Sequence, residues 1–289
     1  MSDKLSSSKR IKEIMSKYRF RFTKSLGQNF LKDVSVVNDI IEQGELTEDD
    51  VVIEIGPGIG VMTENIAQKA GKVIAVEIDK NLIPILNETL SDYDNIEIIN
   101  EDILKIDLNG LKEKYFPDKK PKIIANLPYY ITTPIIMKFL ESNFEFQSMI
   151  VMMQKEVAER IVSNPGNKVY GTISVAVQYY AKPMMVLEVP KGAFVPEPNI
   201  SSSVLKLIPY EDGLVNVTDH KLFLRTIKGA FSTRRKTLLN ALSNEFNKDN
   251  VRKALELSGI NPGERGEKLS VKEFAKLSNA FAEVEKSSR

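Results

Sequence analysis

Cysteine and tryptophan are absent from the 289-residue sequence, and histidine occurs once, as His220. A chain without cysteine has no disulfide bond, no zinc–thiolate site and no thiol nucleophile. Because one histidine cannot build a multi-histidine centre, we predict that no metal ion is bound. For His220 we expect an ordinary surface position at the start of a helix. These absences suit a cytoplasmic protein.

Long hydrophobic runs are also missing. The run at residues 148–153 is far shorter than the roughly 20 apolar residues that a membrane-spanning helix needs. The first residues are polar and basic, without the apolar segment of a signal peptide. We therefore expect no membrane association and a soluble, cytoplasmic protein. Since no coiled-coil seam stands out, we expect a monomer.

Charge is unevenly distributed, although the formal net charge is only +1. Residues 1–35 contain nine Lys or Arg and three acids, and residues 218–256 contain nine basic residues and four acids. The rest of the chain carries a net charge of −10. Two basic segments on an acidic body indicate contact with a polyanion, although a charge run taken alone is usually a solvated surface.

From about residue 50 onward, apolar strands alternate with helical segments. We predict strands at residues 51–55, 72–78, 95–100, 122–127, 147–154, 184–189 and 202–209. We predict helices at residues 63–70, 80–90, 134–142, 156–163 and 171–181. This alternation predicts an α/β fold with a Rossmann-like, largely parallel sheet and helices on both faces. The last two strands follow each other without a helix, so we expect them to form an antiparallel edge.

The pattern changes after Tyr210. Residues 211–216 are predicted to form a loop, and helical periodicity then continues to about residue 285, with a turn at residues 259–263. We therefore expect two domains. An α/β domain at residues 1–210 includes the basic N-terminal segment, and an all-helical domain occupies residues 217–289.

A glycine-rich loop follows the first predicted strand. The segment Glu54-Ile55-Gly56-Pro57-Gly58-Ile59-Gly60 lets the backbone turn sharply and approach a ligand closely. Glu77 ends the next strand about 20 residues later and is placed to accept hydrogen bonds from both hydroxyls of a ribose. After the third strand, Asp102 is placed to accept a hydrogen bond from an adenine amino group, with Ile103 packing on the ring. Together these residues predict a pocket for adenosine, which a nicotinamide-dependent enzyme would share.

The segment Asn126-Leu127-Pro128-Tyr129, at the end of the fourth strand, favours a different chemistry. The lone pair of an aromatic amine is delocalised into its ring, so the nitrogen is a poor nucleophile. Acceptors for both N–H groups favour a more tetrahedral nitrogen. The side-chain carbonyl of Asn126 offers one, and the backbone carbonyl of Leu127 or Pro128 offers the other. Tyr129 offers an aromatic face for a base swung out of its helix.

With these motifs the chain resembles the ribosomal RNA adenine N6,N6-dimethyltransferases, and most of all the bacterial small-subunit (16S) branch of that family. Further segments extend the resemblance over nearly the whole chain: KSLGQNFL at residues 24–31, FVPEP at residues 194–198 and FSTRRKTL at residues 231–238. Ile200 replaces the valine that is frequent in the family's Pro-rich loop, which is a conservative difference.

The resemblance implies a class I methyltransferase that uses S-adenosylmethionine. It implies cofactor contacts at Gln28, Asn29, Leu31, Gly56, Gly58, Glu77, Ile78, Asp102, Ile103 and Asn126. It also implies that Phe194 stacks opposite Tyr129 around the target adenine, although phenylalanine is usually a core residue. The implied substrate is a pair of adjacent adenines in a hairpin near the 3′ end of 16S rRNA, within a partly assembled 30S ribosomal subunit.

Basic residues in two of these motifs are candidates for contact with the RNA backbone. Lys24 lies in the N-terminal motif, and Arg234, Arg235 and Lys236 are consecutive in FSTRRKTL. On a helix, three consecutive side chains cannot all face the core, so we expect them to supply salt-dependent affinity for phosphate. A solvated helix face is the alternative for any one of them.

Three other functions stay open on the sequence alone. The large-subunit (23S) rRNA methyltransferases of the macrolide-resistance type share the cofactor pocket and the amine motif, but FSTRRKTL is not expected in them. A nicotinamide-dependent oxidoreductase fits the topology and is disfavoured by the amine motif. A non-catalytic ribosome assembly factor would bind immature rRNA, a role that is compatible with catalysis.

Overall fold

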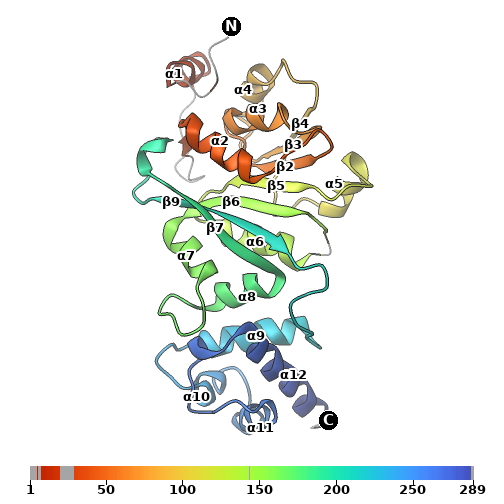
Figure 1. Cartoon of the computed structure of the whole chain (residues 1–289), viewed down its shortest axis with the longest axis vertical. Helices are drawn as coiled ribbons and strands as arrows, with labels where there is room; N and C mark the ends of the chain where they lie inside the picture. The colour runs from red at the N-terminus through yellow and green to blue at the C-terminus, as the bar shows by residue number, and fades with distance from the viewer. Residues whose placement is uncertain (1–4, 6–7, 20–28, 143, 288–289) are drawn as a thin grey trace. The chain divides into compact units, whose positions relative to one another are not determined.

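The computed structural model describes residues 5, 8–19, 29–142 and 144–287 (Figure 1). The chain divides into two compact units, one comprising residues 1–158 and 184–209 and the other comprising residues 159–183 and 210–289. The chain passes from the first unit to the second near residue 210, close to the boundary that we predict after Tyr210. Residues 159–183 belong to the predicted α/β domain but fall in the second unit. They group with the helical unit because Tyr170, Val175 and Tyr179 are buried in its core.

The first unit is built around a seven-stranded sheet. Its strands are β2 (Val51–Ile55), β3 (Lys72–Glu77), β4 (Ile96–Asn100), β5 (Lys122–Asn126), β6 (Ser148–Gln154), β7 (Ala181–Val189) and β9 (Ser202–Pro209). The helices are α1 (Ser8–Lys17), α2 (Val34–Gln43), α3 (Val61–Ala67), α4 (Ile83–Thr89), α5 (Leu108–Tyr115), α6 (Thr132–Glu141) and the 3-10 helix η2 (Lys191–Ala193). Helix α7 (Lys155–Val162) and strand β7 carry the chain between the two units.

The strand order is β4-β3-β2-β5-β6-β9-β7, with β4 to β6 parallel and β9 antiparallel to β6 (Figure 1). Ile55 of β2 pairs with Val76 of β3 on one side and Ala125 of β5 on the other, so the carboxyl ends of these strands meet at one edge. Chain order reverses around β2, which is where open α/β sheets bind ligands. The expected α/β fold with an antiparallel edge is confirmed.

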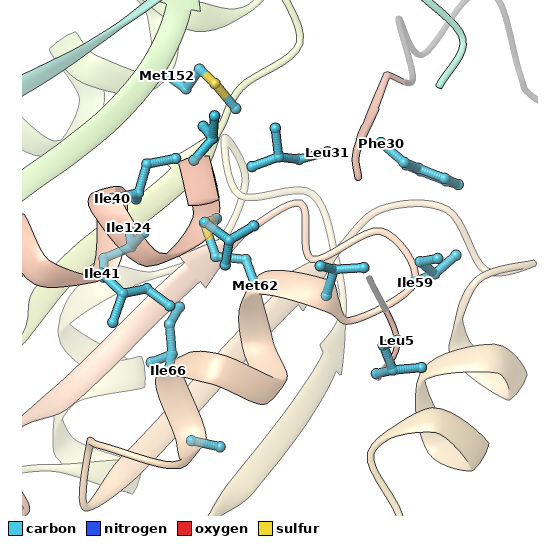
Figure 2. Packing of buried hydrophobic residues seen from close by; sticks show 14 of the residues in the cluster. Leu5, Phe30, Leu31, Ile40, Ile41, Ile59, Met62, Ile66, Ile124 and Met152 are labelled. Carbon is cyan, nitrogen blue, oxygen red and sulfur yellow. The ribbon is translucent and has the colours of Figure 1, made fainter. Parts of the chain in front are cut away.

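Both faces of the sheet are buried at its central strands, β2, β5 and β6. On one face, Val52 and Ile124 belong to a cluster that includes side chains of α2, α3 and α4, part of which is shown in Figure 2. On the other face, the neighbouring residues Ile53 and Ile123 have no exposed surface. Strands buried on both sides are apolar along their whole length, which is why their positions are visible in the sequence.

Several elements of the first unit are absent from the sequence-based prediction. Helices α2 and α5 begin after Asp33 and Asp107, whose side chains accept hydrogen bonds from backbone N–H groups as N-caps. Helix α1 and the two-stranded antiparallel sheet of β1 (Phe30–Leu31) with β8 (Phe194–Val195) were also unforeseen. Strands of two residues have no periodicity from which to predict them.

The second unit is helical. It contains α8 (Thr172–Tyr180), α9 (His220–Phe231), α10 (Leu238–Leu242), α11 (Lys248–Ser258), the 3-10 helix η3 (Gly266–Lys268) and α12 (Val271–Ser287). Asp219 caps the start of α9, and Gly259, with a φ of 68°, ends α11 in the left-handed conformation that favours glycine. His220 begins α9 and is exposed, as expected, with its Nδ1 3.1 Å from the hydroxyl of Tyr179.

The described residues contain neither a membrane-spanning helix nor a cluster of metal ligands. No helix among them is long and apolar enough to cross a membrane. Within the same part of the chain, no group of three or more acidic or histidine side chains is arranged to hold a metal ion.

Candidate active site

A cavity opens at the carboxyl ends of β2 to β5. It is lined by every described residue that we predict to belong to a site in the α/β domain. These residues are Asn29, Leu31, Gly56, Gly58, Glu77, Ile78, Asp102, Ile103, Asn126, Leu127, Pro128, Tyr129 and Phe194. Lys24 and Gln28 lie outside the described residues.

The glycine-rich loop forms part of the cavity wall between β2 and α3. Gly56, Gly58 and Gly60 have φ values of 71°, 63° and 93°, where residues other than glycine are strained. A Cβ atom at Gly58 would lie 3.1 Å from two ring carbons of Phe30, which is tighter than an ordinary contact. The loop therefore needs glycine for its backbone angles and, at Gly58, for the close approach of β1.

Glu77 is held by main-chain hydrogen bonds at the end of β3. The N–H of Asp79 donates to its Oε1 at 2.8 Å, and the N–H of Gly58 donates to its Oε2 at 3.3 Å. Burial raises the pKa of Glu77 to about 7, although these N–H groups partly oppose that effect. Each carboxylate oxygen keeps a lone pair, so the side chain can accept further hydrogen bonds from a ligand in the cavity.

Glu54 lies in the same wall and was not assigned a role from the sequence. It has no exposed surface, and neither of its carboxyl oxygens has a hydrogen-bond partner within the described structure. Burial, with a smaller contribution from the charge of Glu77, raises the pKa of Glu54 to about 8. An acid inside an otherwise apolar strand, two residues before the glycine loop, was the signal that could have singled it out.

Asp102 begins a tight loop after β4. Its Oδ1 accepts a hydrogen bond from the N–H of Leu104 at 3.0 Å, and its backbone carbonyl accepts one from the N–H of Ile106 at 3.1 Å. Beside it, Ile103 is buried, whereas Ile78 on the adjacent strand end is 48% exposed. The ends of β3 and β4 thus contribute one carboxylate and two apolar side chains to the cavity lining.

The predicted amine motif forms a fixed turn after β5. The side-chain Nδ2 of Asn126 donates to the carbonyl of Asn29 at 3.1 Å, and no described residue donates to its Oδ1. The carbonyl of Pro128 accepts from the N–H of Ile131 and the hydroxyl of Thr132. No described donor contacts the carbonyl of Leu127. Of the two backbone acceptors that the sequence left open, that of Leu127 is therefore the available one.

Two aromatic residues of the motifs line the cavity in different environments. The hydroxyl of Tyr129 lies 2.9 Å from the hydroxyl of Ser202 on β9, and the ring is half-buried. Phe194 is 2% exposed and belongs to the core cluster, so it reaches the cavity as a buried wall residue. The pairing of Leu31 with Phe194 joins the N-terminal segment to the Pro-rich loop. Phe30 and the 56% exposed Tyr130 also line the cavity and were missed.

The three cations of FSTRRKTL lie in the second unit, and one of them is used structurally. Residues 232–236 form a turn between α9 and α10 rather than the helix we expected. The Arg234 guanidinium donates to the backbone carbonyls of Lys168 and Tyr170 and lies 4.0 Å from a carboxylate oxygen of Glu267. Arg235 and Lys236 are exposed, and their side chains have no partner within the described structure.

Comparison with known proteins shows relatives along nearly the whole chain. A model of the family described as ribosomal RNA adenine dimethylase matches residues 19–283. The protein named ribosomal RNA small subunit methyltransferase A from Alkaliphilus oremlandii is 50% identical over 283 residues, which covers 97% of this chain and 99% of that protein. The protein of the same name from Clostridioides difficile is 47% identical, with 96% of each chain covered.

Solved structures agree with these relatives. A dimethyladenosine transferase from Plasmodium falciparum matches with a TM-score of 0.73 and 27% identity, covering 89% of this chain and 98% of that chain. The 23S rRNA methyltransferase ErmE matches with a TM-score of 0.67 at 24% identity, which supports the fold alone. The resemblance inferred from the motifs is confirmed, and the chain belongs to the ribosomal RNA adenine dimethylase family.

Proposed function

We propose that this protein transfers methyl groups from S-adenosylmethionine to N6 of two adjacent adenosines in a hairpin near the 3′ end of 16S rRNA, within the 30S subunit. The observation that carries the proposal is the orientation of Asn126. Its Nδ2 is bonded to Asn29, which leaves the Oδ1 as an acceptor in a cavity that also contains Glu77 and Asp102. The relatives that are about half identical are named for the small subunit, which favours 16S over 23S rRNA.

The residues present fit the cofactor. The left-handed glycines let a ligand approach the backbone, and Glu77 keeps lone pairs for two ribose hydroxyls. Asp102 is proposed to accept from the adenine amino group, with Ile78 and Ile103 as apolar residues of the same lining. The unpartnered carboxyl of Glu54 suits a ligand that carries positive charge. S-adenosylmethionine supplies a methyl group on a positively charged sulfur, which is already a good leaving group.

In the proposed mechanism, the protein prepares the nitrogen that receives the methyl group. The Oδ1 of Asn126 and the carbonyl of Leu127 accept the two N–H groups of the adenine, which directs the nitrogen lone pair away from the ring. Each transfer would form an N6–carbon bond as the carbon–sulfur bond breaks, and the nitrogen would release one proton to solvent. After the first transfer a single N–H remains, so one acceptor is enough to hold the amine for the second. Tyr129 and Phe194 provide aromatic walls for the flipped base. Positioning then supplies most of the rate enhancement.

Arg235 and Lys236 are not part of the described cavity lining. Arg235 and Lys236 offer unpaired cations to the phosphate backbone, and Lys24 is proposed for the same role from the N-terminal motif. Arg234 is proposed to support this surface through its bonds to the loop at residues 168–170. We further propose that the enzyme acts as a cytoplasmic monomer without a metal ion, and that binding to immature subunits gives it a role in their assembly.

A methyl-transfer assay on ribosomal particles tests the proposal. Purified protein and radiolabelled S-adenosylmethionine are incubated with 30S particles that lack the modification, with 50S particles as the control. We expect label in the 30S particles only, and N6,N6-dimethyladenosine at neighbouring positions after nuclease digestion. Label in the 50S particles would instead indicate the large-subunit activity. Tight binding to 30S particles without label would leave only the assembly role.

A further inference from the structure

Helix α6 follows the amine turn directly and carries a lysine that reaches the loop after β4. The Nζ of Lys138 donates to the backbone carbonyl of Ile106 at 2.6 Å. We propose that Lys138 is a positioning residue that ties the adenine-binding loop at residues 101–107 to the turn that holds the target amine. The proposal rests on the proposed function, because it assumes that Asp102 receives the adenine of the cofactor.

The loop is compact enough to transmit this contact. The backbone carbonyl of Asp102 accepts from the N–H groups of Lys105 and Ile106, at 2.8 and 3.1 Å. The Asp102 side chain accepts from Leu104. Because Asp102 and Ile106 are joined within one hydrogen-bonded turn, fixing the carbonyl of Ile106 also limits the positions open to the carboxylate of Asp102.

The charges around Lys138 make the contact stronger than an ordinary surface hydrogen bond. Its side chain is half-buried, and burial lowers its pKa, whereas the charges of Asp102, Asp107 and Glu101 oppose that effect. The three carboxylates of the loop thus favour the charged form of the lysine. A charged donor on a carbonyl is worth roughly twice a neutral one.

Tyr130, one residue after the amine motif, also lines the cavity. Burial raises its pKa, with a smaller contribution in the same direction from the charge of Asp102. Among the described residues, the hydrogen bond of Lys138 is the one that joins the segment from the amine motif through α6 to the loop. Loss of Lys138 therefore removes this tie without altering the amine turn itself.

The test compares Lys138→Met with a matched variant. Methionine keeps the length of the side chain and removes the donor. Lys112→Met is the control, since Lys112 is also a half-buried lysine, 3.9 Å from Glu145, and lies outside the cavity lining. Calorimetry measures binding of S-adenosylhomocysteine and of its analogue with purine in place of adenine, and thermal unfolding monitors the fold.

We expect Lys138→Met to weaken S-adenosylhomocysteine binding about tenfold, the loss of one charge-assisted hydrogen bond. The purine analogue should be weakened much less, since it lacks the amino group that Asp102 would hold. In the methyl-transfer assay KM for S-adenosylmethionine should rise with kcat nearly unchanged. Lys138→Arg, which keeps a charged donor, should recover most of the affinity. Lys112→Met should bind like the wild type.

Asp102→Ala separates failure of this inference from failure of the proposed function, because it removes both acceptor oxygens. If Asp102→Ala weakens binding and Lys138→Met does not, the positioning role is wrong and the adenine site stands. If neither change affects binding, the adenine site itself is wrong. Equal weakening of both ligands by Lys138→Met, or a fall in kcat that Lys138→Arg does not restore, would also overturn the positioning role.

Discussion

The cavity at the strand ends holds its functional side chains by hydrogen bonds to the main chain, whereas the basic turn at residues 232–236 leaves two of its three cations unpaired. In the cavity, Glu77 and Asn126 each use part of their hydrogen-bonding capacity on backbone groups and keep the rest. In the turn, Arg234 is engaged by two carbonyls and a carboxylate. One region is rigidly prearranged, and the other presents charge at a surface.

The cavity and the basic turn differ in how far their motifs can be interpreted residue by residue. A glycine loop or a strand-end turn specifies backbone geometry, so the position of a side chain along the motif also fixes its position in space. A run of cations specifies charge only. Whether a particular arginine faces RNA or supports a neighbouring loop depends on partners from distant parts of the chain, such as residues 168–170.

The largest expected effect comes from breaking the prearranged region. Asn126→Ala removes the acceptor for the target amine and should lower kcat about 100- to 1,000-fold, the usual cost of losing one transition-state hydrogen bond. Binding of S-adenosylhomocysteine and of 30S particles should change little. Single-turnover methylation and filter binding measure the two quantities separately.

Asn126→Asp is the matched control for that change, because it keeps a carbonyl-type oxygen and loses the donor to Asn29. It should retain more activity than Asn126→Ala. Wild-type turnover by Asn126→Ala would show that the side-chain oxygen plays no part in activating the amine.

An intermediate effect is expected in the basic turn, where the three cations should separate by role. Replacing Arg235 and Lys236 together by Ala should weaken RNA binding roughly tenfold and reduce the slope of log affinity against log salt by about 1.5. Their exposed side chains contribute little to the stability of the fold, so the melting temperature should stay unchanged. Filter binding at several salt concentrations gives both numbers.

Arg234→Ala provides the contrast within the same turn. It should lower the free energy of unfolding by about 1 to 2 kcal/mol, because it leaves the carbonyls of Lys168 and Tyr170 without their donor. It should reduce the salt slope less than the double change does. Equal slopes for all three single variants would contradict the division of roles drawn from the structure.

The sequence predicted the parallel strands and the residues of the cavity because both depend on local pattern. The structure of an apolar strand such as Val51–Ile55, and of the glycine loop that follows it, is determined by residues that are neighbours in the sequence. The pairing of Leu31 with Phe194 joins segments far apart in the chain, and no local signal announces it. The same holds for the contact of Lys138 with Ile106. The contacts of Arg234 with Lys168 and Tyr170 were not predicted because its partners are backbone carbonyls, which every sequence contains.

The pH dependence of cofactor binding should arise in the cavity, and it should be weaker than the effects above. The pKa of Glu77 is raised to about 7 by burial, and ribose hydroxyls would bind its ionised form. Below pH 7 the Glu77 carboxyl must release a proton before it can bind the ribose in its ionised form, which lowers the affinity for the cofactor. The affinity should therefore rise with pH and level off above about pH 7. We expect about a threefold gain in S-adenosylhomocysteine affinity between pH 6 and pH 8, under the roughly tenfold that full coupling to a pKa of about 7 allows over this interval. Glu77→Gln should bind more weakly and remove this part of the dependence, whereas Arg235→Ala should leave the profile unchanged. An identical profile in wild type and Glu77→Gln would mean that another group, such as the buried carboxyl of Glu54, controls the titration.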